Sequence, residues 1–117
     1  MAAAGIIAEY NPLHRGHCHQ LRRIRALLGE ETPVICAMSG NFVQRGDFAL
    51  LPKHARAEAA VRSGADLVLE IPLSWACAPA ERFAQGGVEV LQATGLVTDL
   101  VFGSESADAE AIRTAAE

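Results

Sequence analysis

The sequence has few aromatic residues and few cysteines, and it lacks any long apolar run. Of its 117 residues only 5% are aromatic, and its three cysteines show no CxxC spacing, which argues against a disulfide framework or a closed zinc site. No apolar stretch reaches the ~18 residues of a membrane span, and no basic region precedes residues 2–8. We therefore expect neither a membrane helix nor a signal peptide, and we expect a cytoplasmic protein with no membrane partner.

Two common phosphate-binding patterns are also missing. The chain contains no GxxxxGK[ST], which excludes a P-loop, and the turn after its first apolar run lacks the GxGxxG of dinucleotide-binding folds. Any phosphate site must therefore use a different arrangement of residues.

The remaining composition is that of one soluble globular domain, with 50% hydrophobic and 21% charged residues. The net charge of -4 excludes a basic coat for nucleic acid, but the charge is unevenly distributed. Residues 1–62 carry eight Lys and Arg against five Asp and Glu, whereas residues 63–117 carry two against nine. We expect an anionic ligand to bind in the first half.

Apolar runs of strand length alternate with segments of helical periodicity. The strands are expected at 6–8, 34–38, 67–71 and 99–102, and the helices at 17–28, 53–62, 80–91 and 107–116. This order predicts an α/β domain over 1–117, with a doubly wound parallel sheet covered on both faces. The ligand crevice of such a sheet lies beyond the carboxyl ends of its strands, and the fourth strand lies beside the first if the order is 3-2-1-4.

The strongest local motif is NPLHRGH at residues 11–17, between the first strand and the first helix. His14 and His17 flank Gly16 at a helix N-terminus, where free backbone N–H groups and the helix dipole favour a phosphate. Two imidazoles directed at one phosphoryl group can stabilise the charge that develops during displacement at the α-phosphorus of ATP. The alternatives are a metal site that adds Glu9 or His19, and a helix cap without chemistry.

Four segments in succession resemble motifs of the tRNA(Met) cytidine acetate ligase family, which belongs to the HIGH superfamily of nucleotidyltransferases. They are GIIAEYNPLHRGH at 5–17, MSGNFVQRG at 38–46, GADLVLEIP at 64–72 and FGSE at 102–105. The sequence departs from the usual motif at Leu13 and Arg15, and neither change removes a proposed catalytic group. The resemblance implies a Rossmann-like ATP-dependent ligase. It would activate acetate as acetyladenylate and acetylate N4 of the wobble cytidine of elongator tRNA(Met).

The resemblance also implies the site residues. His14 and His17 would be catalytic, as stabilisers of the transition state, with Mg²⁺ screening the triphosphate and no separate metal site in the protein. Gln44 and Arg45 are candidates for contact with a phosphate or with RNA. The expected ATP-binding residues are Ile7, Ala8, Glu9, Tyr10, Asn11, His14, Gly16, His17, Gln20 and Gly103.

Several other residues have two interpretations. At the start of the 53–62 helix, Lys53, His54 and Arg56 could extend a path for RNA. We expect Asp66 to serve the turn into its strand, Glu70 to face the crevice, and Trp75 to pack rather than stack on a base. The three arginines of the first helix are expected to form a solvated face, at positions Arg22, Arg23 and Arg25.

Other functions stay open on the sequence alone. They are a stand-alone nucleotidyltransferase that makes a nucleotide cofactor, a non-catalytic module that binds nucleotide or RNA, and, more distantly, a metal-binding module. Because chains of the resembled family continue well past residue 117, we expect an N-terminal part that keeps much of the phosphate site. We do not expect it to complete tRNA acetylation alone.

Overall fold

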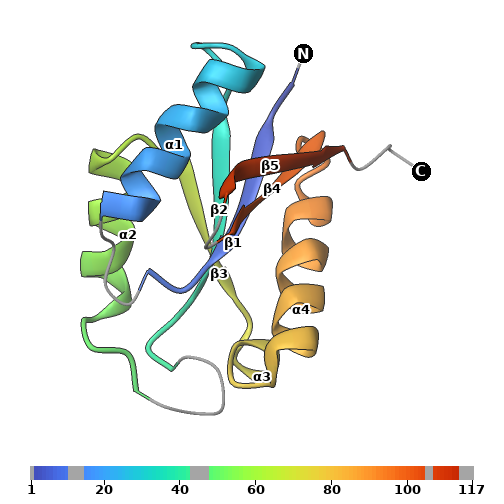
Figure 1. Cartoon of the computed structure of the whole chain (residues 1–117). Helices are drawn as coiled ribbons and strands as arrows, with labels where there is room; N and C mark the ends of the chain where they lie inside the picture. The colour runs from blue at the N-terminus through green and yellow to red at the C-terminus, as the bar shows by residue number, and fades with distance from the viewer. Residues whose placement is uncertain (1, 11–14, 43–47, 105–106, 114–117) are drawn as a thin grey trace.

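The structure is a computed structural model that describes residues 2–10, 15–42, 48–104 and 107–113, with side chains to residue 101. Its central sheet has the order β3-β2-β1-β4-β5 (Figure 1). The elements, in chain order, are β1 Ala4–Ala8, α1 Arg15–Leu28, β2 Val34–Ser39, α2 Lys53–Arg62, β3 Leu67–Ile71, α3 Leu73–Ala76, α4 Ala80–Ala93, β4 Asp99–Ser104 and β5 Ala107–Arg113.

The first four strands are parallel, which confirms the doubly wound α/β prediction and the order 3-2-1-4. β1 lies at the centre, with Ile6 opposite Cys36 of β2 and Val101 of β4. β2 pairs in turn with β3, so the carboxyl ends of all four strands lie at one edge of the sheet. That edge is where the loops with the candidate site residues emerge.

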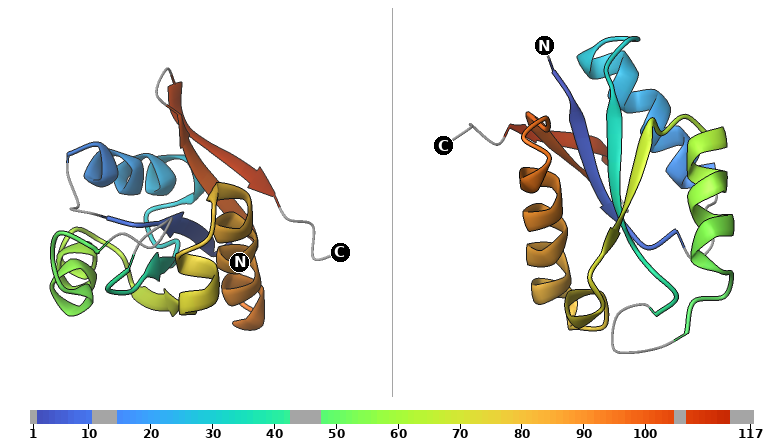
Figure 2. Two further views of the ribbon diagram at one scale, coloured as in Figure 1. Left: turned by 90° about the horizontal axis from the view of Figure 1, so that it is seen from below. Right: turned by 180° about the vertical axis from the view of Figure 1, so that it is seen from behind.

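Helices cover both faces of the sheet (Figure 2). On one face, Leu21 and Ile24 of α1 and Ala60 of α2 pack against the side chains of β1 and β2. On the other face, Phe83 and Leu91 of α4 pack on the alternate side chains of the same strands. Burial on both faces explains why the central strands are continuous apolar runs rather than alternating patterns.

The helices begin and end next to glycine and proline residues of the sequence. α1 stops before Gly29, whose φ of 125° is easy only for glycine, and α2 is followed by Gly64 with a φ of 127°. Pro52 precedes the first residue of α2, where its missing N–H costs nothing. These bounds agree with the predicted helices to within about two residues.

One predicted element is wrong. Residues 107–116 were expected to form a helix because they are rich in alanine and glutamate, but the structure has β5 at Ala107–Arg113, antiparallel to β4. The backbone ladder pairs Leu100 with Ile112 and Val101 with Ala111. Hydrogen bonding to the otherwise open edge of β4 outweighs local helix propensity here. β4 also runs through Gly103 instead of stopping before it.

Two adjacent glycines let α4 lie close to the sheet. A Cβ on Gly87 would stand 2.6 Å from Cγ2 of Ile7, and one on Gly86 would stand 2.4 Å from Trp75. A side chain on Gly87 would push α4 away from β1, and one on Gly86 would push α4 away from Trp75 of α3, so both contacts of α4 depend on glycine. Among the described residues, no helix is long and apolar enough to cross a membrane.

Candidate functional site

The candidate site begins where β1 ends. Ile7 packs against α4 and Ala8 packs on the opposite face, beside α1 and α2, so both side chains are committed to the core. Glu9 follows outside the strand and is half-buried. A ligand at this edge of the sheet would therefore contact mainly the backbone of this segment.

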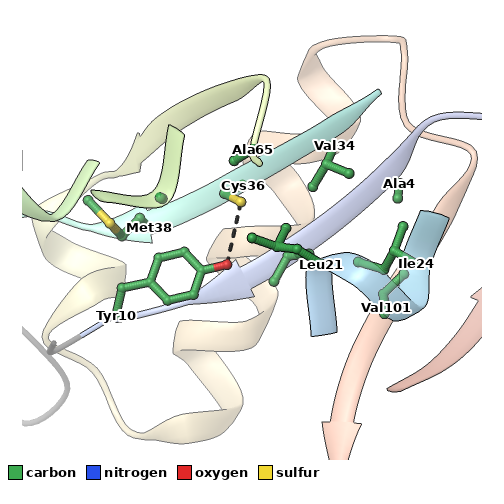
Figure 3. Packing of buried hydrophobic residues seen from close by; sticks show 11 residues of the cluster. Ala4, Tyr10, Leu21, Ile24, Val34, Cys36, Met38, Ala65 and Val101 are labelled. Carbon is green, nitrogen blue, oxygen red and sulfur yellow. Dashed lines mark hydrogen bonds between the residues drawn. The ribbon is translucent and has the colours of Figure 1, made fainter. Parts of the chain in front are cut away.

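Tyr10 turns the chain away from the sheet. Its φ is 47°, the left-handed region that non-glycine residues rarely adopt, and its side chain is 1% exposed. The hydroxyl lies 3.6 Å from Sγ of Cys36 on β2 (Figure 3). Burial raises the pKa of the Tyr10 phenol well above its ordinary value and that of the Cys36 thiol to about 11, so both groups are neutral at pH 7.

The Tyr10 ring also contacts the start of α1. The ring centroids of Tyr10 and His17 are 4.8 Å apart, and the ring planes meet at 74° in an edge-to-face contact. A buried aromatic ring anchored to β2 therefore fixes one side of the His17 imidazole. Because the Tyr10 side chain belongs to the core, any contact of Tyr10 with a ligand is through its backbone.

The N-terminal turn of α1 is open to solvent. Gly16 is exposed and His17 and Gln20 are half-buried, all within the first six residues of the helix. The first turn contains no acidic residue. Its backbone N–H groups and the positive end of the helix dipole are the features that favour a bound phosphate.

Gly103 comes from the other neighbour of β1. β4 pairs with β1 up to Ile6 and Val101, and both strands continue toward the same edge of the sheet. The backbone of Gly103 is thus brought to the side of the site opposite β2, as the strand order requires. The sheet therefore brings together the ends of β1 and β4 and the start of α1.

Four candidate residues lie outside the described part of the chain. They are Asn11, His14, Gln44 and Arg45, and their roles stay predictions.

The end of β2 carries a second group of polar residues. Lys53 Nζ is 2.9 Å from Glu70 Oε1, and Lys53 donates its backbone N–H to the Asn41 side chain. A Cβ on Gly40 would come within 2.2 Å of Glu70 Oε2, so glycine there leaves room for the carboxylate. Lys53 and Glu70 border a cavity of about 200 Å³ between α2 and β3. The structure places Glu70 near the carboxyl end of β3, paired with Lys53, and its expected role at the crevice stays a prediction.

The predicted RNA path along α2 is wrong for Arg56. Its side chain is 1% exposed, and its guanidinium donates hydrogen bonds to the backbone carbonyls of Glu9, Gly40 and Leu51. Sequence reasoning missed this role. The signal available was the spacing of four between Arg56 and Ala60, which puts Arg56 on the buried face of the helix.

Two further expectations are confirmed. Asp66 Oδ2 accepts the Val34 backbone N–H at 2.8 Å and pairs with Arg25 at 2.9 Å, so it fastens the entry of β3 to β2. Trp75 packs on α4 at Gly86 rather than standing free. Within the described residues, no three His, Cys, Asp or Glu side chains are grouped to hold a metal ion.

Comparison with known proteins gives a consistent result. The family model described as HIGH Nucleotidyl Transferase matches residues 1–117. Two curated relatives carry the name tRNA(Met) cytidine acetate ligase. The one from Syntrophotalea carbinolica is 51% identical over all of this chain, and the one from Fervidobacterium nodosum is 47% identical over 99% of it. The chain spans 27% of the length of each.

The fold has a close match among solved structures. Thermotoga maritima TmcAL bound with alpha-thio ATP superposes with a TM-score of 0.84 and 52% identity, over 91% of this chain and 26% of the other. The match of the family model over the whole length, together with the parallel strands β1 to β4 and the HxGH motif of the sequence, leads to one conclusion. The chain belongs to the HIGH nucleotidyl transferase family.

Proposed function

We propose that the chain is the ATP-binding, adenylate-forming part of a tRNA(Met) cytidine acetate ligase. The observation that carries the proposal is that Gly16 and His17 of the HxGH motif lie in the open first turn of α1, near the end of β1, with the end of β4 alongside. Two observations support it. Relatives of that name are about 50% identical in sequence to this chain, and the fold is similar to that of a structure bound with an ATP analogue.

The first step is adenylation of acetate. A carboxylate oxygen of acetate attacks the α-phosphorus of ATP, the bond to the β-phosphate oxygen breaks, and pyrophosphate leaves. His14 and His17 donate hydrogen bonds to phosphate oxygens as negative charge builds on them. Tyr10 holds the His17 ring on one side, so that the imidazole needs little rearrangement as the reaction proceeds.

The nucleotide is held mainly by backbone. The segment from Ile7 to Glu9 faces it from one side and Gly103 from the other, Gly16 lets it approach the helix, and Gln20 lies one turn further along α1. Mg²⁺ would accompany ATP as part of the substrate and would screen the charge of the triphosphate, with few ligands from the protein. The excess of basic residues in the first half of the chain favours this polyanion.

The second step transfers the acetyl group to tRNA. N4 of the wobble cytidine of elongator tRNA(Met) attacks the acyl carbon of acetyladenylate, and AMP leaves. Gln44 and Arg45, which follow β2 in the sequence, are our candidates for contact with a phosphate or with RNA. The chain covers about a quarter of the length of its relatives, so we propose that most of the tRNA-binding surface lies in the part that it does not cover. We also propose that the enzyme works in the cytoplasm.

Acetate-dependent exchange of labelled pyrophosphate into ATP tests the first step. The assay uses a protein in which this chain is followed by the remaining three quarters of the Thermotoga maritima relative. We expect exchange with acetate, and a fall of about 100-fold or more in His17→Ala, as for loss of a preorganised donor. The matched control is His19→Ala, an exposed histidine on the same helix, which should exchange like the parent.

Three results would contradict this reading. Exchange driven by a nucleotide substrate without any response to acetate would indicate a cofactor-forming nucleotidyltransferase. ATP binding in calorimetry without exchange would indicate a binding module. Full exchange in a folded His17→Ala variant would remove the proposed role of that residue.

A further inference from the structure

Arg56 is an unusual residue for the inside of a small domain. Among the residues whose side chains the structure describes, it is the largest that is less than 2% exposed, and it extends from the buried face of α2 toward the end of the sheet. Arginine is almost never fully buried unless its donors are satisfied. The hydrogen-bond partners of Arg56 therefore indicate its role.

Its three hydrogen-bond partners come from three segments. Glu9 is the first residue after β1, Gly40 is the first residue after β2, and Leu51 lies just before α2. All three acceptors are backbone carbonyls. One planar guanidinium thus joins two neighbouring strand ends to the loop that leads into α2, a geometry that its forked donors suit.

The contact with Glu9 places Arg56 directly behind the candidate site. Glu9 is followed by Tyr10, whose ring contacts His17, and it is preceded by the strand end that we propose to face ATP. Gly40, whose carbonyl accepts from Arg56, lies just past the end of the neighbouring strand, and its Cα faces the Glu70 carboxylate closely enough that a Cβ would not fit. Arg56 therefore sets the spacing between the ends of β1 and β2 without reaching the ligand itself.

The charge of Arg56 is part of this arrangement. Burial lowers the pKa of the guanidinium, and the nearby carboxylates of Glu9 and Glu70 oppose that effect. Glu70 is already paired with Lys53, so the direct partners of Arg56 are the three carbonyl dipoles. Hydrogen bonds from a charged donor in a dry setting are strong, and they hold these carbonyls firmly.

We infer that Arg56 is a positioning residue of the nucleotide site, one that holds the carbonyls of Glu9 and Gly40 and through them the turn that carries Tyr10 and His17. The inference rests on the proposed function. It predicts that loosening this contact slows the chemical step more than it weakens binding of ATP.

The main test variant is Arg56→Lys, which keeps the charge but cannot span three carbonyls from one ammonium group. In the exchange assay described above, we expect kcat to fall by about 10- to 100-fold while KM for ATP changes by less than about threefold. Arg56→Met is the more severe variant. The matched control is Arg62→Met, because Arg62 is on the same helix, is 77% exposed and pairs only with Glu58 among the ion pairs of the described residues.

A spectroscopic measurement tests the same contact without catalysis. The ¹H and ¹³C resonances of the His17 imidazole report on the Tyr10 ring, and they are assigned with a His17→Gln variant. We expect them to move in Arg56→Lys and to stay in place in Arg62→Met. If the parent protein shows no exchange but these shifts occur, the proposed function fails while the positioning contact stands.

The inference is overturned if folded Arg56→Lys keeps both the parent kcat and the parent His17 resonances. It is also overturned if the loss of kcat only follows the folded fraction measured by circular dichroism. Unfolding of both Arg56 variants at 15 °C would count against it as well, because Arg56 would then serve the fold as a whole. If only Arg56→Met unfolds, Arg56→Lys decides.

Discussion

The close approach of α4 to β1 makes a quantitative prediction at Gly87. A methyl group there would stand 2.6 Å from Cγ2, 2.7 Å from Cγ1 and 2.9 Å from Cδ1 of Ile7. All three distances are shorter than carbon atoms tolerate, and Ile7 belongs to the packed face beneath α4. Gly87→Ala must therefore shift either the helix or the end of β1.

The expected magnitude follows from two opposing effects. Overpacking by one methyl group costs about 3 kcal/mol at the upper end of its usual range. Replacing glycine with alanine within a helix returns about 1 kcal/mol. The free energy of unfolding should thus fall by about 2 kcal/mol, or about 8 °C in melting temperature at roughly 4 °C per kcal/mol.

Truncating the residue that clashes should remove this cost. Ile7→Ala alone should lose about 2 kcal/mol, but in the double variant the methyl of residue 87 occupies space that Ile7 has vacated. Because the overpacking is removed while the helix gain of alanine remains, the double variant should then lose about 1 kcal/mol rather than about 4, a coupling of about 3 kcal/mol. Gly86→Ala is the matched control, because its methyl group would meet Trp75, so its combination with Ile7→Ala should be additive.

Urea unfolding of the five variants and the parent chain measures these values. The reasoning is refuted if Gly87→Ala is as stable as the parent. It is refuted equally if its cost adds to that of Ile7→Ala within about 0.5 kcal/mol.

Two further predictions concern the core and the sheet entry. The pKa of Cys36 is raised from 9.0 to about 11, so between these pH values the unfolded chain binds fewer protons, and stability should fall by at most about 1.4 kcal/mol per pH unit. Denaturation midpoints from pH 8 to 11 should show this fall, with a shallower slope in Cys36→Ala; equal slopes would contradict it. Asp66→Ala removes the acceptor of the Val34 N–H, so the free energy of unfolding should fall by about 1 to 2 kcal/mol. Asp66→Asn keeps that acceptor and loses only the charge that pairs with Arg25, so the fall should be less than about 1 kcal/mol. Equal losses in urea unfolding would show that charge, not the hydrogen bond, matters there.

Most of the fold could be predicted because local sequence signals determine where its helices and strands begin and end. β3 and α2 have the predicted bounds, since Pro52, Gly64 and Pro72 mark their ends and apolar periodicity fills the interval. β5 could not be predicted in the same way. Its Ala- and Glu-rich sequence favours a helix locally, and only the open edge of β4 makes it a strand.

The candidate site also has a part that local sequence predicts and a part that depends on the tertiary fold. The HxGH motif could be located because it is contiguous and follows a strand. The parts that depend on convergence could not, since nothing in the sequence indicates that Tyr10 is buried with a φ of 47° or that three carbonyls meet at Arg56. A buried charge and a core aromatic residue look like surface and ligand residues until the strands that surround them are known.

The central place of β1 has a consequence for the order of events during synthesis. Among the described strands, β1 leaves the ribosome before its partners, and it pairs with β2 after a short separation, but its other neighbour, β4, follows some ninety residues later. Contacts between such distant segments form slowly, because the intervening chain must be closed into a loop. Until then one edge of β1 stays without a partner, and a nascent chain stalled before β4 would expose that edge to other strands and to chaperones.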